Sequence, residues 1–131
     1  MSWLRYRILA IMKPNPRAAI AFIAGTLILS KKSTSIYDYS QSKYIMIGGT
    51  VNQDKVNVYD YDQGCHVSGK GNNGTFNLYH YGDSHHIQLK IFNSKFKGYD
   101  YGSSCHFEGS VNGKSVSLYD YGNSSYFSYS I

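Results

Sequence analysis

The chain has 131 residues and a formal net charge of +5, from 13 Lys and Arg against eight Asp and Glu. Four of the basic residues fall within the first 17 positions, and the other nine meet all eight acids from position 31 onward. Because nucleic-acid binding needs a basic stripe or patch, this balance in the main part of the chain argues against a nucleic-acid partner.

The first segment differs from the rest of the chain. Residues 1–17 are basic, and residues 18–30, AAIAFIAGTLILS, are apolar and uncharged. A basic start followed by an apolar run of about 7–15 residues is typical of a secretory signal, whereas a membrane-spanning helix needs about 20 residues. We therefore predict that residues 1–33 are a signal peptide or an uncleaved signal anchor. An ordinary buried helix is the remaining interpretation, but the rest of the chain predicts no second helix that would bury it.

This prediction sets the expected location of the protein. We expect a secreted protein associated with the cell surface, or a protein anchored by its uncleaved first segment. Contact with a membrane is expected only through residues 18–30, and only if they are not cleaved.

A repeated motif of the form Tyr-x-Tyr fills the remaining chain. Its five copies begin 22, 20, 20 and 20 residues apart, at Tyr37, Tyr59, Tyr79, Tyr99 and Tyr119. A fixed period near 20 residues indicates stacked or meandering supersecondary units. We predict one domain over residues 34–131, with repeats at 34–55, 56–75, 76–95, 96–115 and 116–131.

Each repeat reads as a strand, a four-residue turn and a second strand. In VNVYDY and HIQLKI, for example, apolar residues occupy alternate positions, which places them on one face of a strand. The residue between the paired tyrosines shares that apolar face, and the tyrosines point the other way. Glycines in one repeat often align with large residues in the next, so that side chains of different size can interlock.

Two all-β architectures satisfy this pattern. In a five-rung parallel β-solenoid, each repeat forms one rung of two strands, and its two apolar faces close on each other. In a ten-stranded antiparallel meander the same turns are hairpin loops, and the Asn-Gly in VNGKSV favours such a loop. We predict the solenoid, because an open meander would leave a long apolar face uncovered.

The stretch FNLYHYGDSHHIQLKI resembles the repeat of the curli amyloid subunits. The curli motif has Gln, Gly, Asn, Ala and Gln at fixed places. Gly82, Gly102 and Gly122 occupy its Gly place in this chain. We expect these arc glycines to begin the turn that joins the two strands of a repeat. The resemblance covers roughly residues 34–131. It implies an exported structural protein that forms extracellular fibres for biofilm or adhesion by end-to-end strand addition, since YFSYSI ends without a protected edge. The expected partners are other copies of the chain, with a nucleator or a secretion channel.

In a parallel stack, the central residues of the five motifs would form one inward column of Asp38, Asp60, His80, Asp100 and Asp120. Carboxylates about 4.8 Å apart repel each other, so this column is expected to be wet at the open end of the arc or to be sensitive to pH or cations. In a meander, equivalent strands lie about 9–10 Å apart and the column matters less.

Other chemistry finds little support in the sequence. Cys65, His85 and Cys105 occupy matching places and are candidate metal ligands, but their spacing does not suit a closed tetrahedral site. We also expect no disulfide between the two cysteines, which lie two rungs apart. No nucleophile, base and orienting group come together, so neither an enzyme nor a cofactor is expected.

The paired tyrosines are expected to form two outward columns that stiffen the stack or make an adhesive face: Tyr37, Tyr59, Tyr79, Tyr99 and Tyr119, and Tyr39, Tyr61, Tyr81, Tyr101 and Tyr121. A second function follows from the adhesive reading. The chain would then be a monomeric, membrane-anchored module that binds surfaces or glycans through its tyrosine-rich face.

Overall fold

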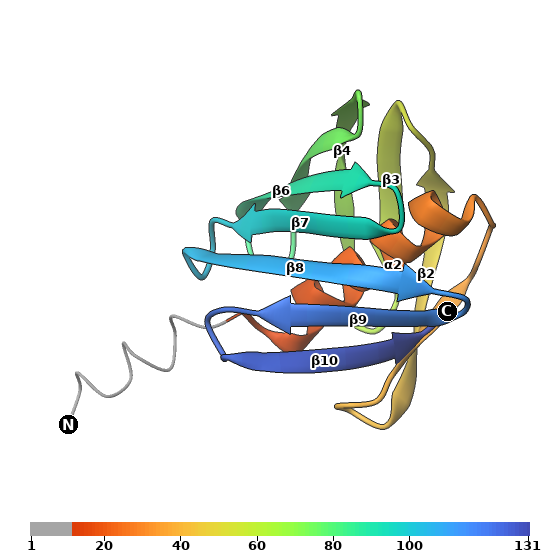
Figure 1. The fold of residues 1–131 in the computed structure, drawn as a ribbon. Helices are drawn as coiled ribbons and strands as arrows, with labels where there is room; N and C mark the ends of the chain where they lie inside the picture. The colour runs from red at the N-terminus through yellow and green to blue at the C-terminus, as the bar shows by residue number, and fades with distance from the viewer. Residues whose placement is uncertain (1–11) are drawn as a thin grey trace.

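The computed structural model describes residues 12–131 as a ten-stranded β-barrel that encloses one helix (Figure 1). The helix α2 spans Pro14–Leu29. The strands are β1 (Ser35–Asp38), β2 (Lys43–Val51), β3 (Lys55–Asp60), β4 (Cys65–Asn72), β5 (Thr75–His80), β6 (His85–Phe92), β7 (Lys95–Asp100), β8 (Cys105–Asn112), β9 (Ser115–Asp120) and β10 (Ser125–Ser130).

Every strand pairs antiparallel with its neighbour in sequence, and β1 also pairs with β10, which closes the barrel. The predicted parallel β-solenoid is therefore wrong. The alternative, an antiparallel ten-stranded meander, is correct in strand order and direction but did not include closure. An open meander would leave its apolar face exposed to water. Closure of the sheet around α2 prevents this, because the apolar inner face of the barrel packs against the helix.

The helix is apolar on all sides, as its position inside the barrel requires. Residues from Ala18 to Ala24 are at most 2% exposed, and the helix contacts strands on different sides of the barrel. Its small side chains let the barrel wall approach closely. A Cβ atom added to Gly25 would lie 3.1 Å from Ile131 and 3.2 Å from Val116.

This placement bears on the predicted signal or anchor. Residues 18–24 and Leu27 of α2 belong to the hydrophobic core, so most of the apolar run that suggests export is buried among the strands. No helix in residues 12–131 has the length and apolar content needed to cross a membrane. Cleavage or anchoring of residues 1–33 stays a prediction, and residues 1–11 lie outside the described part of the chain.

Alternation along the strands holds throughout the barrel. Inward residues such as Val58, Leu78 and Leu118 are at most 1% exposed. The expected interlocking of large and small residues occurs across neighbouring strands. Gly98 lies opposite Phe107, and Phe96 lies opposite Gly109, so each phenyl ring covers a glycine.

Candidate functional site: the tyrosine belt and the ring beneath it

Five aromatic clusters form a belt around the outside of the barrel, at the end where the turns after the odd-numbered strands lie. Each cluster contains the two motif tyrosines and the aromatic residue or histidine opposite the first of them on the next strand. The clusters of this tyrosine belt are Tyr37/Tyr39/Tyr44, Tyr59/Tyr61/His66, Tyr79/Tyr81/His86, Tyr99/Tyr101/His106 and Tyr119/Tyr121/Tyr126.

The geometry is nearly the same in all five clusters. The first tyrosine is half-buried and meets both other rings edge-on; in the fourth cluster, Tyr99 lies 4.8 Å from Tyr101 and 4.8 Å from His106, centroid to centroid. The second tyrosine is exposed in every cluster, from 51% in Tyr121 to 66% in Tyr61. The third member is exposed as well, with Tyr44 at 68% and Tyr126 at 72%. Each cluster therefore presents at least one solvent-accessible phenol that contacts the first tyrosine.

The predicted tyrosine columns are corrected by this arrangement. Among the described residues, the ring contacts of the belt join residues of one repeat, and the tyrosines of successive repeats do not stack. The reason is the antiparallel order, which places another strand between equivalent strands. Backbone bonds link neighbouring clusters instead: the Tyr101 N–H donates to the His86 carbonyl at 3.0 Å, and the Tyr121 N–H donates to the His106 carbonyl at 3.2 Å.

Two surface grooves lie between neighbouring clusters. The larger, about 490 Å³, crosses β6, β7 and β8 and is lined by Gln88, Lys90, Lys97, Gly98, Tyr99, His106, Phe107, Glu108 and Tyr121. The smaller, about 330 Å³, lies one repeat earlier, with His86 and Tyr101 in the places of His106 and Tyr121. Repetition of the strands thus produces repeated grooves, and outward side chains distinguish them.

Glu108 adds a charge to the larger groove. Its carboxylate accepts a hydrogen bond from the Tyr121 hydroxyl, and this bond is the main cause of the raised pKa of Tyr121. The belt side chain is held over the groove by this contact.

Beneath the belt, the central residues of the motifs point inward and form a ring. Asp38, Asp60, His80, Asp100 and Asp120 are at most 5% exposed, so the expectation of a wet column is not met. All five accept a backbone N–H of the turn that follows. The Asp120 carboxylate, for example, accepts the Gly122 N–H at 2.9 Å, and the His80 Nδ1 accepts the Asp83 N–H at 3.1 Å. Such capping explains why a short polar acceptor recurs at this place.

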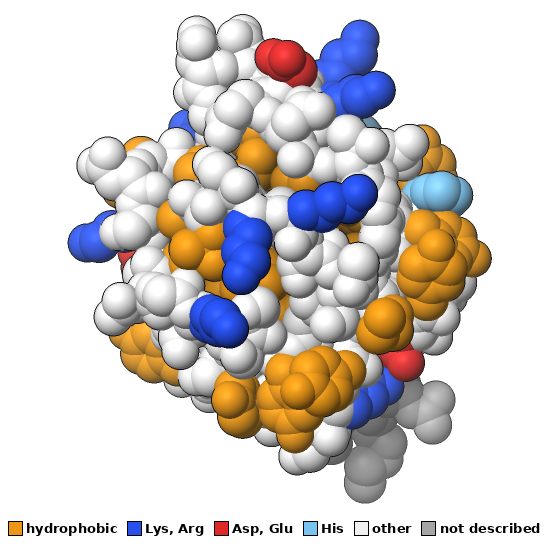
Figure 2. Space-filling view, turned by 90° about the vertical axis from the view of Figure 1, so that its right-hand side faces the viewer, with side chains coloured by type: hydrophobic (Ala, Val, Ile, Leu, Met, Phe, Trp, Pro, Cys, Tyr) orange, Lys and Arg blue, Asp and Glu red, His pale blue; other side chains and the backbone are white. Residues whose placement is uncertain are grey.

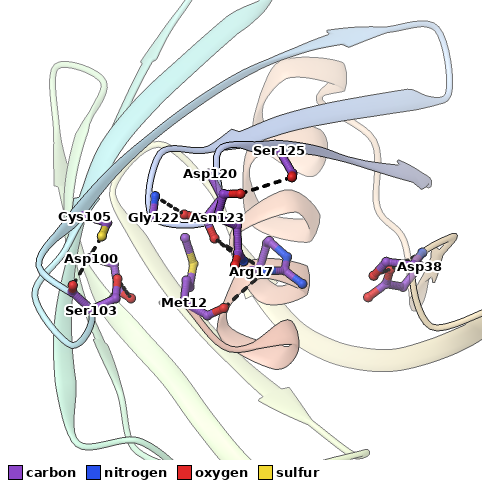
Figure 3. Close-up of polar contacts among 11 residues, drawn as sticks. Met12, Arg17, Asp38, Asp100, Ser103, Cys105, Asp120, Gly122, Asn123 and Ser125 are labelled. Atoms are coloured by element: carbon purple, nitrogen blue, oxygen red, sulfur yellow. Dashed lines mark hydrogen bonds and ion pairs between the residues drawn. The ribbon is translucent and has the colours of Figure 1, made fainter. Parts of the chain in front are cut away.

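Arg17, in the first turn of α2, is the cation of this ring (Figure 3). It is 4% exposed; its Nη1 lies 3.4 Å from the Asp120 carboxylate and donates to the Met12 carbonyl at 3.2 Å. The guanidinium also stacks on Phe127, 3.4 Å from the ring centroid. The N-terminal end of the helix lies at the same end of the barrel as the ring. Because a helix N-terminus carries a partial positive charge, this direction of the helix is favourable next to the carboxylates of the ring.

Burial also shifts the pKa values of His80, a member of the ring, and of Tyr129, which lies near it. Desolvation lowers the pKa of His80, although Asp83, Asp60 and Asp100 oppose the shift. Desolvation likewise raises the pKa of the Tyr129 hydroxyl, against the influence of Arg17. Both groups are therefore neutral near pH 7.

The three candidate ligands do not form a metal site. No group of three or more His, Cys, Asp or Glu side chains in residues 12–131 is arranged to hold a metal ion. Neither cysteine forms a disulfide, and burial raises the pKa of the Cys65 thiol.

The three side chains pack against the predicted arc glycines of the following repeat. A Cβ atom on Gly82 would lie 2.9 Å from the Cys65 sulfur, one on Gly102 would lie 2.3 Å from the His85 ring, and one on Gly122 would lie 2.8 Å from the Cys105 sulfur. These glycines therefore provide space. The left-handed backbone position of each turn belongs to Ser42, Gly64, Ser84, Ser104 and Ser124, not to the arc glycine.

A further cavity of about 460 Å³ lies at the other end of the barrel, between the last turns of α2 and β2. Phe22 and Leu27 contribute to its lining, with Lys31 and Lys32 at the rim. Figure 2 views the end of the molecule near the C-terminus and shows Lys and Arg side chains grouped around apolar ones.

The sequence did not predict the third member of each cluster. Tyr44, His66, His86, His106 and Tyr126 each begin an outward-facing row of a second strand, and only antiparallel register places them opposite the first tyrosines. Their regular place after each four-residue turn was the available signal. No family model, curated protein or solved structure matches this chain.

Proposed function

We propose that this protein is a non-catalytic binding module that holds a polysaccharide along its tyrosine belt. The supporting observation is that the second motif tyrosine is exposed in all five clusters, at 51–66%, while its ring contacts the first tyrosine. Soluble proteins rarely present large aromatic side chains in a regular array unless those side chains contact a partner.

Tyrosine chemistry suits a sugar. The ring offers a flat apolar surface to the C–H face of a sugar, and its hydroxyl bonds to sugar hydroxyls. Contact of the exposed ring with the first tyrosine of its cluster lowers the conformational entropy that binding would cost, as in other tyrosine-rich binding surfaces.

Repetition adds to the affinity of each cluster. Neighbouring clusters are two strands apart, about 9–10 Å by strand spacing, so a polymer with repeating units can engage several at once. Engagement of a second cluster is then intramolecular and raises the overall affinity without new kinds of contact.

The other function expected from the sequence, fibre growth by strand addition, needs an unpaired edge strand. In the barrel, β10 pairs with β9 along its whole length and with β1 at Tyr129 and Ser130, so the end of the stretch YFSYSI is already paired on both sides. The geometry therefore favours the binding module. This proposal does not depend on export or anchoring, because burial accounts for the apolar segment.

The test is retention of the full-length protein on insoluble polysaccharides such as cellulose, chitin and bacterial cell wall. We expect Tyr61→Ala, Tyr81→Ala and Tyr101→Ala each to weaken binding about fivefold, from the loss of roughly 1 kcal/mol of aromatic contact. The triple variant should lose binding far more. Phe92→Ala is the matched control, because Phe92 is 46% exposed and lies outside the belt.

Equal retention of the triple variant and the Phe92→Ala control would contradict the proposal. So would failure of the unaltered protein to bind any polysaccharide while it forms fibres at high concentration, which would favour the structural role instead.

A further inference from the structure

The larger groove differs from its counterparts in charge. Lys90 on β6 and Lys97 on β7 lie directly opposite each other on the outer face of the barrel. Like charges in this position destabilise a sheet. In residues 12–131, neither lysine forms an ion pair, although Lys97 also lies opposite Glu108 on β8 and near the Phe92 ring.

The equivalent strand pairs lack this feature. In the same register, Asn57 lies opposite Thr50, Asn77 opposite Lys70, and Ser117 opposite Ser110. A second pair of opposed lysines, Lys55 and Lys70, joins β3 and β4, but neither of them lines a groove of the belt. Of the two belt grooves, the larger one alone is therefore lined by lysines, although both share the aromatic framework. An anion bound in this groove would neutralise the unfavourable contact between Lys90 and Lys97.

The remaining lining narrows the kind of anion. Tyr99 and Tyr121 provide aromatic surface, Gln88 has both a donor and an acceptor, and Glu108 is an acceptor. Sugar hydroxyls need both donors and acceptors. A nucleic acid fits this groove poorly, because its phosphates would face the Glu108 carboxylate. An extended peptide fits poorly as well, because β7 is paired on both sides and offers no sheet edge.

We propose that the groove formed by Gln88, Lys90, Lys97, Tyr99, Glu108 and Tyr121 binds an acidic sugar unit. The carboxylate or sulfate of that unit lies between the ammonium groups of Lys90 and Lys97, and its ring lies on the tyrosines. Hydrogen bonds between charged partners are stronger than neutral ones, so this groove ranks above the other four clusters. The inference rests on the proposed function and names the ligand class.

The experiment is titration of the full-length protein with tetrasaccharides, followed by calorimetry and by amide chemical shifts. The probes are a galacturonic-acid tetrasaccharide, a sulfated chondroitin tetrasaccharide and neutral maltotetraose. We expect at least one acidic probe to bind more tightly than the neutral one, with shifts at Tyr99 and Glu108; comparison of the two acidic probes shows whether carboxylate or sulfate is preferred.

The variant Lys90→Gln/Lys97→Gln should bind that probe about tenfold more weakly, because it loses two partly exposed charge pairs with the acidic group of the probe. Its affinity should also no longer depend on salt concentration, because salt screens such pairs. Lys70→Gln is the matched control, because Lys70 occupies the place of Lys90 one repeat earlier, opposite Asn77, and does not line the groove. It should change the affinity less than twofold. All three lysines are exposed, so none of these substitutions should lower the temperature of thermal unfolding.

Equal weakening by Lys70→Gln and by the double variant would overturn the inference, as would equally tight binding of a glutamate oligopeptide. If the neutral sugar binds as well as the acidic ones, and binding needs Tyr99 but neither lysine, this inference fails while the proposed function stands. If no sugar binds, both fail.

Discussion

Arg17 and Asp120 are joined inside the barrel, with 3.4 Å between the guanidinium nitrogen and the carboxylate oxygen and exposures of 4% and 0%. One residue belongs to the first turn of the helix and the other ends β9, so the pair ties the enclosed helix to the wall. The same carboxylate accepts the N–H of Gly122, which couples the helix to a turn beneath the belt.

Neutralising this carboxylate should therefore cost more than neutralising another member of the ring. We expect Asp120→Asn to lower the free energy of unfolding by about 3 kcal/mol, because it leaves a buried cation without its ion pair. Urea unfolding measures the change. Asp100→Asn is the control; Asp100 caps its turn through Gly102 and Ser103, and its loss should cost about 1 kcal/mol. Equal losses in the two variants would show that the ion pair contributes nothing.

His80 should make the barrel sensitive to acid. Burial lowers its pKa in the folded state, so protonation favours the unfolded chain. Its contribution to stability is then complete above the unfolded pKa of about 6.5 and is lost as the pH falls from there through the folded pKa. We expect His80→Asn to flatten the decline in stability between pH 7 and pH 5, measured by urea unfolding at several pH values. His86→Asn, at an exposed position, should leave the decline unchanged.

Gly122 should not tolerate a side chain. A Cβ atom there would lie 2.8 Å from the Cys105 sulfur and 3.2 Å from an Asp120 oxygen. We expect Gly122→Ala to destabilise the protein by about 1–3 kcal/mol through overpacking, and the added change Cys105→Ala to restore part of that loss. Thermal unfolding of the single and double variants measures the effect. Absence of any rescue would mean that the sulfur is not the obstacle.

Removal of the helix should abolish the fold. Because residues 18–24 and Leu27 of α2 lie in the core, a chain of residues 31–131 would expose the inner face of the barrel to water. We expect it to show no cooperative unfolding transition by circular dichroism. Ile20→Ala in the full-length chain, at a fully buried position, should cost about 2–5 kcal/mol without abolishing the fold. A stable, cooperatively folded 31–131 would instead support a cleaved signal or an anchor.

Much of the local structure could be predicted from the sequence. The five repeats, the two strands in each and the inward and outward faces follow from spacing and from the two-residue period of a strand, which are local properties. The outward tyrosines such as Tyr61 and the inward residues such as Asp60 were assigned to their faces for this reason.

The direction of the strands could not be predicted in the same way. A four-residue turn keeps the apolar face inward whether the next strand runs parallel or antiparallel, so residues such as Val58 and Leu78 are buried in either architecture. The choice between the two architectures depends on what covers the apolar face of the strands. The solenoid covers it with its own second strands, and the closed barrel covers it with α2.

The roles of the helix and of the belt depend on how the whole chain folds. The apolar character of residues 18–30 and the recurrence of the tyrosines can be read from the sequence, because composition and period are local properties of the chain. Burial of the helix depends on closure between β1 and β10, which are some 90 residues apart. Likewise, pairing of Tyr59 with His66 and of Lys90 with Lys97 depends on register between strands. Closure and register are set by the free energy of packing the whole core, and no single segment contains that information.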